Sequence, residues 1–448
     1  MVLYTPFTDL QPRTFARFER HLGELPKDRA AEDHLFLISS RDPAGERKLD
    51  SWSQDGSVIG IALPWRGDLP LQIIMMLARR IARRNLYEET LPVTGKAFFG
   101  RRQLLTELLE ETREGRVFGV FGLRKTGKTS LVKEVGQRFQ EGGEQSRIFI
   151  LRDLETLPSS SPRLGSEFVQ DLRQAFLAAL RPSRVRTKEI TDLSPDASIG
   201  ELRRAVGASI IDAKRSGIRI VLALDEIEYL IGDSEALSRG GRPEVPEILG
   251  ALRSLVQENS NFAVILSGIT SALIHRGDIY GVENPFYSWA KVFYVPPMSQ
   301  AEIRTLTVEV GIRMGLRWTE PALLALFRET EGNVFLHRTL AAQVVAGVKI
   351  DDFEEPLDTD DVDRARSEWK RSISERIAES YRSTQRHYPT ECGLLEMFAR
   401  GDATKEELLG IYPREVNRLI ELNLLVGPVP NRMELGIVAR LLREGGSI

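Results

Sequence analysis

The sequence predicts an α/β fold in which helices flank a parallel sheet, and three observations lead to it. An apolar run at residues 117–121 passes through a glycine-rich loop into a helical pattern. A second apolar run, Ile218–Leu224, ends in the adjacent acids Asp225 and Glu226. Further apolar runs of strand length alternate with helical patterns at residues 147–151, 262–268 and 291–295. Uniformly apolar strands separated by helices are typical of a parallel sheet that is buried on both faces.

The loop after the first of these strands is a P-loop. Its residues, with the one that follows, are Gly122, Leu123, Arg124, Lys125, Thr126, Gly127, Lys128, Thr129 and Ser130. The glycines allow the backbone to curl around a phosphate with several N–H groups pointing inward. We expect Lys128 to bring its charge to the β- and γ-phosphates and the Thr129 hydroxyl to bind Mg²⁺. The motif therefore predicts a site for ATP and Mg²⁺, and the alternative is a chance match in a Gly/Lys/Thr turn.

The acidic pair is the second chemical landmark. In open α/β sheets ligands bind beside the carboxyl ends of the strands, so Asp225 and Glu226 are expected next to the P-loop. Asp225 would hold Mg²⁺, and Glu226 would position and deprotonate the attacking water. Together with Lys128, these residues predict Mg²⁺-dependent ATP hydrolysis. The alternative is a strand end capped by two solvated acids.

The composition limits the partners and the compartment. The 448 residues include 61 Lys and Arg against 64 Asp and Glu, so the net charge of −3 gives no general attraction to nucleic acid or acidic membranes. The single cysteine, Cys392, excludes an internal disulfide and a cysteine-based metal site, and it fits a reducing compartment. The first residues have no signal-peptide pattern, and no apolar run approaches the roughly 18 residues of a membrane span. We therefore expect a soluble, cytoplasmic protein with no membrane partner.

Residues 1–90 predict a small α/β domain that acts as an effector or partner module. Short apolar runs at 35–38 and 58–63 have the pattern of buried strands, joined by a loop and a crossover helix. A further helix is expected over Leu69–Leu86. Its polar side carries Arg79, Arg80, Arg83 and Arg84. This cluster would meet DNA or an acidic partner, or it is a solvated helix face.

A second feature of this domain has the spacing of a catalytic motif. Glu46 and Lys48, with Asp33 and Asp42, match the Glu-x-Lys pattern of metal-dependent nucleases. That chemistry requires the motif on a strand, whereas Pro43-Ala44-Gly45 predicts a turn here. A nuclease is therefore the weaker alternative for this stretch.

The segment before the P-loop strand provides a resemblance to a known family. Phe99, Gly100 and Arg101, the amphipathic helix Gln103–Arg113 and the P-loop together resemble the entry to the signal-transduction ATPases with numerous domains (STAND). These are a branch of the AAA+ class that includes the archaeal ATPase family. The resemblance implies that Phe99, Gly100 and Arg101 form part of the pocket for the adenine base.

The same resemblance assigns roles after the acidic pair. It implies that strand 262–268 lies between the P-loop strand and the acidic-pair strand, with Ser267 as a sensor of the γ-phosphate. Ordinary turn chemistry at a strand end is the alternative for Ser267. Arg276 is a candidate arginine finger for a neighbouring subunit or, equally, a surface arginine.

The remainder of the chain predicts a lid and a C-terminal domain. Ser299 and Glu302 form a capping box that opens a helical lid, continued by the helix Glu320–Thr330. The segment Glu331–Leu336 resembles a Gly-Asn-Pro segment at which related ATPases let the lid touch the nucleotide, but Val334 replaces the proline. The acidic stretch 350–363 marks a boundary that few contacts should cross.

After a long helix to Ser383, three short helices and two strands resemble a winged helix. If this domain read DNA, Arg414, Asn417 and Arg418 would face the groove. The glutamates between these side chains favour a regulatory or packing role.

The sequence thus predicts a P-loop NTPase fold with a small N-terminal α/β domain, a helical lid and a C-terminal winged helix. The expected parts are residues 1–90, 95–298, 299–350 and 356–448. The resemblance implies an ATP-driven switch that assembles as a homo-oligomer and controls an effector or sensor partner, in prokaryotic signalling or antiviral defence. The alternative is a DNA-binding AAA+ ATPase that loads or remodels a nucleoprotein complex.

Overall fold

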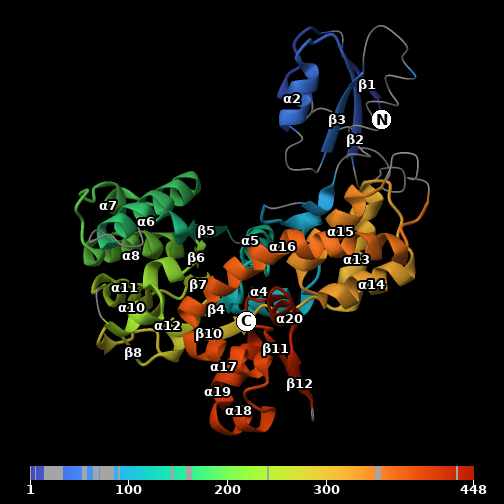
Figure 1. The fold of residues 1–448 in the computed structure, drawn as a ribbon. Coiled ribbons are helices and arrows are strands. Elements are labelled where there is room, and N and C mark those ends of the chain that lie inside the picture. The colour runs from blue at the N-terminus through green and yellow to red at the C-terminus, as the bar shows by residue number, and fades with distance from the viewer. Residues whose placement is uncertain are drawn as a thin grey trace. The chain divides into compact units, whose positions relative to one another are not determined.

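The computed structural model describes the larger part of the chain, and Figure 1 labels most of its helices and strands. The described residues are 2–5, 7–14, 34–52, 58–63, 70, 85–88, 91–142, 146–157, 164–239, 242–348, 355–429 and 432–448. They divide into two compact units. The N-terminal unit comprises residues 1–89, 304–328 and 338–369, and the P-loop unit comprises residues 90–303, 329–337 and 370–448.

The P-loop unit is built on a five-stranded sheet in which all neighbouring strands are parallel. In spatial order the strands are β10 (Lys291–Tyr294), β4 (Phe118–Phe121), β7 (Phe262–Gly268), β6 (Arg219–Asp225) and β5 (Arg147–Asp153). The predicted parallel sheet is confirmed, and β7 lies between the P-loop strand and the acidic-pair strand as the resemblance implied. Because parallel strands end at the same edge, this order brings the carboxyl ends of β4, β7 and β6 together.

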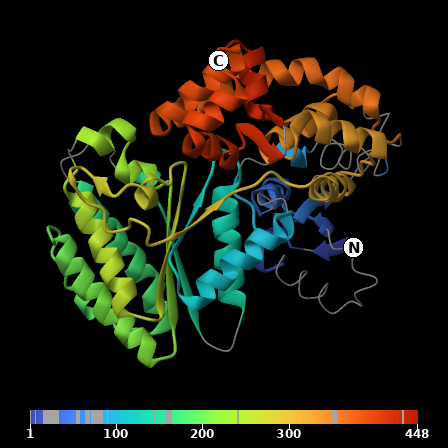
Figure 2. The same ribbon diagram turned by 90° about the horizontal axis from the view of Figure 1, so that it is seen from below.

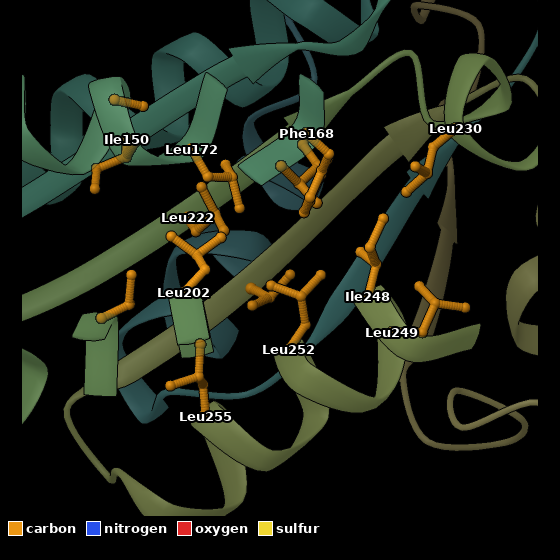
Figure 3. Close-up of a cluster of buried hydrophobic side chains, with 14 of the residues drawn as sticks. Ile150, Phe168, Leu172, Leu202, Leu222, Leu230, Ile248, Leu249, Leu252 and Leu255 are labelled. Carbon is orange, nitrogen blue, oxygen red and sulfur yellow. The ribbon is translucent and has the colours of Figure 1, made fainter. Parts of the chain in front are cut away.

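Helices cover both faces of this sheet because its strands are apolar on both sides. On one face lie α6 (Leu164–Leu180), α8 (Ile199–Arg215) and α11 (Glu244–Glu258), and on the other lie α4 (Arg102–Glu114) and α5 (Lys128–Glu141) (Figure 2). Successive residues of β6 alternate between the two layers. Leu222 packs with α6, α8 and α11, as Figure 3 shows, whereas Val221 and Ala223 pack with α4 and α5.

Short elements connect these helices and strands. They are η3 (Gly95–Ala97), η4 (Leu154–Thr156), η5 (Arg181–Ser183), α7 (Lys188–Thr191), α9 (Glu228–Ile231), α10 (Ser234–Arg239), α12 (Ala272–His275), β8 (Asp278–Ile279) and β9 (Val282–Glu283). The last two form an antiparallel hairpin that the sequence did not indicate.

The C-terminal part of the P-loop unit is mainly helical. Its elements are the second half of α16 (Thr359–His387), α17 (Pro389–Arg400), α18 (Lys405–Ile411), α19 (Pro413–Glu421), the antiparallel strands β11 (Leu425–Val429) and β12 (Arg432–Leu435), and α20 (Ile437–Glu444). The three short helices and the strand pair occur in the predicted order. Helix α20 was not predicted. The winged-helix assignment remains a proposal.

These C-terminal elements pack against the rest of the P-loop unit. The Asn423 amide donates to the carbonyl oxygen of Val295 at 3.4 Å. The Arg418 guanidinium lies over the Tyr294 ring, 5.2 Å from its centroid. The expectation that few contacts cross the acidic stretch is therefore wrong, because residues 370–448 share a compact unit with the P-loop.

The N-terminal unit contains a second, smaller parallel sheet. Its strands are β1 (Val2–Thr5), β2 (His34–Ser40) and β3 (Val58–Leu63), in that spatial order. The unit also includes α2 (Gly45–Trp52), η2 (Leu86–Glu88) and parts of α13 (Gln300–Arg313), α14 (Glu320–Thr330), α15 (Val334–Ala346) and α16. Strands β2 and β3 and the helix between them agree with the predicted small α/β unit, and β1 was missed.

The nuclease alternative for the N-terminal unit does not fit the structure. Glu46 and Lys48 lie on α2, whereas the chemistry requires a strand. The Lys48 ammonium pairs with Asp42 at 2.7 Å and with Asp9 at 2.5 Å. Lys48 therefore stabilises the loop around Asp42. Asp33, the remaining residue of the motif, lies outside the described residues.

The arginine cluster of Arg79, Arg80, Arg83 and Arg84 also lies outside the described residues. None of the helices that the structure describes has the length and apolar character needed to cross a membrane.

Candidate nucleotide-binding site

The P-loop follows β4 and leads directly into α5, as predicted. Gly127 caps this 14-residue helix with a φ of 88°, a left-handed conformation that suits glycine. The first N–H groups of α5 therefore face the loop, which is the arrangement that binds phosphate. The Thr126 hydroxyl donates to the carbonyl oxygen of Leu123 at 2.9 Å and closes the loop.

The P-loop lysine is held inside the loop. Lys128 is 4 % exposed, and its ammonium donates to the carbonyl oxygens of Gly122 at 3.2 Å and Leu123 at 3.0 Å. Both acceptors are neutral carbonyl oxygens, and no carboxylate of the described residues accepts a hydrogen bond from this ammonium. An anionic phosphate in the loop would accept a charge-assisted hydrogen bond from this ammonium.

The two expected Mg²⁺ ligands meet in the structure. The Thr129 hydroxyl donates to a carboxylate oxygen of Asp225 at 2.7 Å. Asp225 is 2 % exposed, and its other carboxylate oxygen accepts the Glu226 N–H at 3.1 Å. A hydroxyl and a carboxylate beside a phosphate loop are hard oxygen donors that suit Mg²⁺. The residues present therefore fit both ATP and Mg²⁺.

Glu226 lies beside this pair in an unusual environment. Its backbone has a φ of 54°, and its Oε2 is buried without a hydrogen-bond partner among the described residues. Burial, followed by the neighbouring carboxyl group of Glu228, raises the pKa of Glu226 to about 8. A carboxyl group with a raised pKa suits the transfer of a proton from water.

Glu228 is the site residue that sequence reasoning missed. It is 6 % exposed, and although burial opposes the charge, the neighbouring Glu226 carboxyl group and the charge of Lys128 lower its pKa. The available signal was an acid between Ile227 and Tyr229, in a stretch that is otherwise apolar.

Ser267 lies at the end of β7, opposite Val120 of the P-loop strand. Its hydroxyl is buried without a hydrogen-bond partner among the described residues, and Ser267 is 0 % exposed. An unsatisfied hydroxyl in this position fits the expected sensor role, which stays a proposal. The Arg276 guanidinium donates to the Ser238 hydroxyl at 3.2 Å, so in this conformation it is used within its own chain.

The segment before the P-loop strand contributes a buried cation to the same region. Arg101 is 8 % exposed, has a φ of 54° and donates through Nε to the Pro296 carbonyl oxygen at 3.1 Å. A Cβ atom placed on Gly127 would lie 3.0 Å from Arg101 Nη1, so the guanidinium lies against the P-loop. Burial lowers the pKa of Arg101 to about 10. Gly100 and the half-buried Phe99 precede it.

A cavity of about 340 Å³ opens beside Arg101 and the P-loop, large enough for a small ligand. Its walls come from four segments of the P-loop unit: Arg101 with Leu123 and Thr126; Val295, Pro296 and Pro297; Glu331, Asn333 and Val334; and, from the C-terminal part, Ile420, Leu422, Asn423, Leu425, Val426, Gly427, Gly436, Ile437 and Val438. Sequence reasoning placed the first and third segments near the nucleotide. It did not place the C-terminal part there.

The segment Glu331–Leu336, called the lid segment below, lies beside this cavity. Contacts within the protein explain why a glycine and an asparagine occur in it. Gly332 has a φ of 77°, and a Cβ atom there would lie 1.9 Å from the Met298 carbonyl oxygen. The Asn333 carboxamide oxygen accepts the N–H groups of Phe335 and Leu336, each at 3.1 Å, and so caps α15. Val334, which replaces the family proline, still lines the cavity.

Two further P-loop cations are held by neighbouring side chains. Arg124 donates to the Tyr229 hydroxyl at 3.2 Å. The Lys125 ammonium lies 4.7 Å from the centroid of the Phe335 ring, and the Arg376 guanidinium lies 4.9 Å from the same centroid. The P-loop therefore contacts Phe335 of the lid segment, and Arg376 of α16 contacts the same ring.

The structure does not keep the three expected DNA-facing residues together. Arg414 and Asn417 are exposed on α19. Arg418 is turned toward Tyr294 and pairs with Glu421 at 3.0 Å, and burial lowers its pKa. The expectation that Arg418 faces a groove is wrong for this conformation, because packing against β10 takes its side chain.

Comparison with known proteins agrees with this geometry. Residues 112–274, which contain the P-loop and the acidic pair, match the family model described as "AAA domain". This segment has the fold of a P-loop ATPase. The AAA segment carries Lys128, Thr129, Asp225, Glu226, Glu228 and Ser267, whereas Arg101 and the C-terminal wall of the cavity lie outside it.

A solved structure with a TM-score above 0.5 has a similar fold over most of this chain. The Walker-type ATPase PABY2304 of Pyrococcus abyssi is 17% identical with a TM-score of 0.56, and the match covers 80% of this chain and 100% of that one. The ORC2 protein of Aeropyrum pernix, described in ADPNP-ADP complexes, is 14% identical with a TM-score of 0.45 over 81% of this chain and 96% of that one. The ORC1 protein of Aeropyrum pernix, in complex with DNA, is 16% identical with a TM-score of 0.39 over 82% and 96%. No curated protein sequence matches the chain.

Proposed function

We propose that this protein is a Mg²⁺-dependent ATPase that works as a nucleotide-controlled switch. The observation that carries the ATPase proposal is the hydrogen bond between Thr129 and Asp225, which joins the P-loop to the acidic pair. It is supported by the adjacent Glu226 and by Lys128, whose ammonium is held among neutral carbonyl oxygens.

The chain's residues have distinct roles in hydrolysis. The P-loop N–H groups and Lys128 bind the phosphates, and Thr129 and Asp225 would hold Mg²⁺, which would supply positive charge to neutralise phosphate charge. Glu226 orients a water toward the γ-phosphorus and takes its proton as the new P–O bond forms and the bond to the β-phosphate oxygen breaks. ADP and inorganic phosphate are the products, and Ser267 is proposed to contact the γ-phosphate.

The cavity supports the switch part of the proposal. One wall is the P-loop with Arg101, and another is the C-terminal part from Ile420 to Val438. A ligand that occupied this cavity would contact both walls, so its affinity would depend on where the C-terminal part lies. We propose, as in the STAND ATPases that the sequence resembles, that ATP promotes homo-oligomer assembly and output to an effector or sensor partner, in prokaryotic signalling or antiviral defence.

A DNA-handling AAA+ ATPase is the second candidate. The exposed Arg414 and Asn417 on α19 favour it, although Arg418 would have to leave Tyr294 to join them. Binding to duplex DNA that weakens steeply with salt would support this candidate. No binding at low salt would exclude it.

The ATPase proposal is tested by phosphate release from ATP with Lys128→Ala, using Lys214→Ala on the exposed face of α8 as the control. We expect the first variant to lose ATP binding or turnover and the control to keep both. Equal turnover of the two variants would reject the P-loop as the active site.

A further inference from the structure

Arg124 is a P-loop cation that lies on the side of the loop where the acidic pair is. Its side chain is partly buried, and its Nη2 donates to the Tyr229 hydroxyl at 3.2 Å. Tyr229 belongs to α9, which begins two residues after Glu226. Arg124 does not line the cavity described above, to which the P-loop contributes Leu123 and Thr126. The guanidinium therefore lies on the side of the loop where the γ-phosphate and the attacking water are expected.

A second hydrogen bond fixes the direction of the first. The Tyr229 hydroxyl donates to Glu155 Oε1 at 2.9 Å. A hydroxyl carries one proton and a carboxylate only accepts, so this proton lies toward Glu155 and the Tyr229 oxygen accepts from Arg124. The three side chains join η4, directly after β5, to the P-loop. They hold one nitrogen of the guanidinium in a defined direction.

The rest of the guanidinium is available to an anion. An arginine has five N–H donors in one rigid plane. Among the described residues, only the Tyr229 hydroxyl accepts from Arg124, and no carboxylate forms an ion pair with it. A direct ion pair with Glu155 would compensate the charge, yet the tyrosine stands between the two groups. The positive charge and the N–H groups of Nε and Nη1 therefore remain for an anionic oxygen.

Resting on the proposed ATPase function, we propose that Arg124 is a catalytic residue of its own subunit, whose guanidinium contacts the γ-phosphate oxygens and stabilises the charge that develops as ADP leaves. Tyr229 is the positioning residue that orients it. The water proton still passes to Glu226. An arginine directed at the transferred phosphate contributes about 10³- to 10⁵-fold to the rate in related chemistry. Arg276, the candidate for a neighbouring subunit, instead donates to Ser238 within its own chain.

The test measures kcat for ATP on the full chain with Mg²⁺, and the Kd for ADP alone and for ADP with aluminium fluoride, which mimics the transferred phosphate. For Arg124→Ala we expect kcat to fall roughly 100-fold or more. The Kd for ADP should stay within about threefold, because ADP has no γ-phosphate. With aluminium fluoride, the Kd should rise by a factor similar to the fall in kcat. Arg215→Ala, an exposed arginine at the end of α8, is the control and should match the wild type.

Tyr229→Phe tests the positioning role. It keeps the ring and removes the hydroxyl, and we expect kcat to fall roughly tenfold with little change in the Kd for ADP. In the Arg124→Ala background, Tyr229→Phe should cause no further fall in kcat, because the residue through which it acts is already gone. If Arg124→Ala does not fold, Arg124→Gln replaces it, since the amide is polar but uncharged; the same fall in kcat is expected.

Three results would overturn the inference. The first is a kcat within about threefold of the wild type for a folded Arg124→Ala or Arg124→Gln. The second is a Kd for ADP that rises as much as kcat falls, which would limit Arg124 to shaping the loop. The third is an equal effect of Tyr229→Phe with and without Arg124. Failure of the ATPase proposal is distinguishable, because Lys128→Ala would then release phosphate from ATP like the wild type.

Discussion

Tyr388, between α16 and α17, is hydrogen-bonded to the backbone just beyond β7: its hydroxyl donates to the carbonyl oxygen of Ile269 at 3.2 Å. The same hydroxyl accepts the N–H of Ser271 at 3.1 Å. Ile269 also donates its own N–H to Glu228, so one peptide segment contacts both the acidic site and the C-terminal part. Burial raises the pKa of Tyr388 to about 12, which keeps the hydroxyl protonated and able to donate.

Tyr388→Phe should destabilise the P-loop unit. The ring still fills its place, but a buried carbonyl oxygen and a buried N–H lose their partner, which costs about 1–3 kcal/mol. Urea denaturation measures the change in the free energy of unfolding. Tyr412→Phe, at an exposed tyrosine before α19, is the control and should change it little. Equal effects of the two variants would show that the Tyr388 hydroxyl does not anchor the C-terminal part.

Arg101→Ala should weaken ATP binding. The guanidinium lines the cavity and lies against Gly127 of the P-loop, where a charged hydrogen bond to the nucleotide would contribute about 1.5–3 kcal/mol. We therefore expect the Kd for ATP to rise roughly tenfold or more. Titration calorimetry measures it, with the exposed neighbour Arg102→Ala as the control. An unchanged Kd in a folded Arg101→Ala protein would remove Arg101 from the nucleotide site.

Gly332→Ala should disturb the lid segment. Its φ of 77° already strains any side chain, and the new Cβ would lie 1.9 Å from the Met298 carbonyl oxygen. Gly315→Ala is the matched control, because Gly315 has a φ of 78° with nothing within 4 Å of an added Cβ. We expect the control to lose about 1–2 kcal/mol from backbone strain alone and Gly332→Ala to lose clearly more. Similar losses in thermal denaturation would mean that the loop relaxes without cost.

Asp42→Asn should destabilise the N-terminal unit at neutral pH. At acid pH the variant and the wild type should be equally stable. The hydrogen bonds from Lys48 and from the Leu10 N–H lower the pKa of Asp42 to about 2. A carboxylate with a depressed pKa contributes stability above its unfolded pKa of about 3.9, and that stability is lost as the pH falls toward 2. Melting temperatures at several pH values should therefore converge for the variant and the wild type. Asp9→Asn, whose side chain is 64% exposed, is the control and should show a smaller difference.

Local signals in the sequence predicted the centre of the fold. Short stretches of about ten residues were enough to predict the five strands of the large sheet, the P-loop and the acidic pair. The signals were apolar runs, with glycines or acids at the strand ends. The meeting of Thr129 and Asp225 then follows from the parallel arrangement of the sheet.

The rest depends on packing between distant residues. Glu228 is recognisable as a site residue only once the fold places it beside Ile269 and Glu226. The spacing of Arg418 in the sequence suggests a DNA-facing residue, but in the structure its side chain packs against Tyr294 of β10. The composition of the acidic stretch suggested a domain boundary. Composition alone does not show that residues after the stretch contact residues before it, as in the hydrogen bond from Asn423 to Val295. Strand β1 and helix α20 are short, and their neighbours in space decide their structure.

The switch proposal is tested by the size of the Glu226→Gln variant. Because this variant should bind ATP without hydrolysing it, it should accumulate the ATP-bound state. Mass photometry should then show a larger species with ATP than without, and Lys128→Ala should not form it. If the larger species needs DNA, the second candidate function is favoured. A constant size with ATP and with DNA would mean that ATP does not drive assembly.

The most direct test of the central claim is phosphate release from Mg²⁺-ATP by the purified chain and by Glu226→Gln. The glutamine is nearly isosteric and leaves the contact between Thr129 and Asp225 in place, but it cannot accept a proton from water. We predict that the variant binds ATP like the wild type and releases phosphate at least about 100-fold more slowly. Phosphate release at the wild-type rate would contradict the assignment of the acidic pair as the catalytic centre.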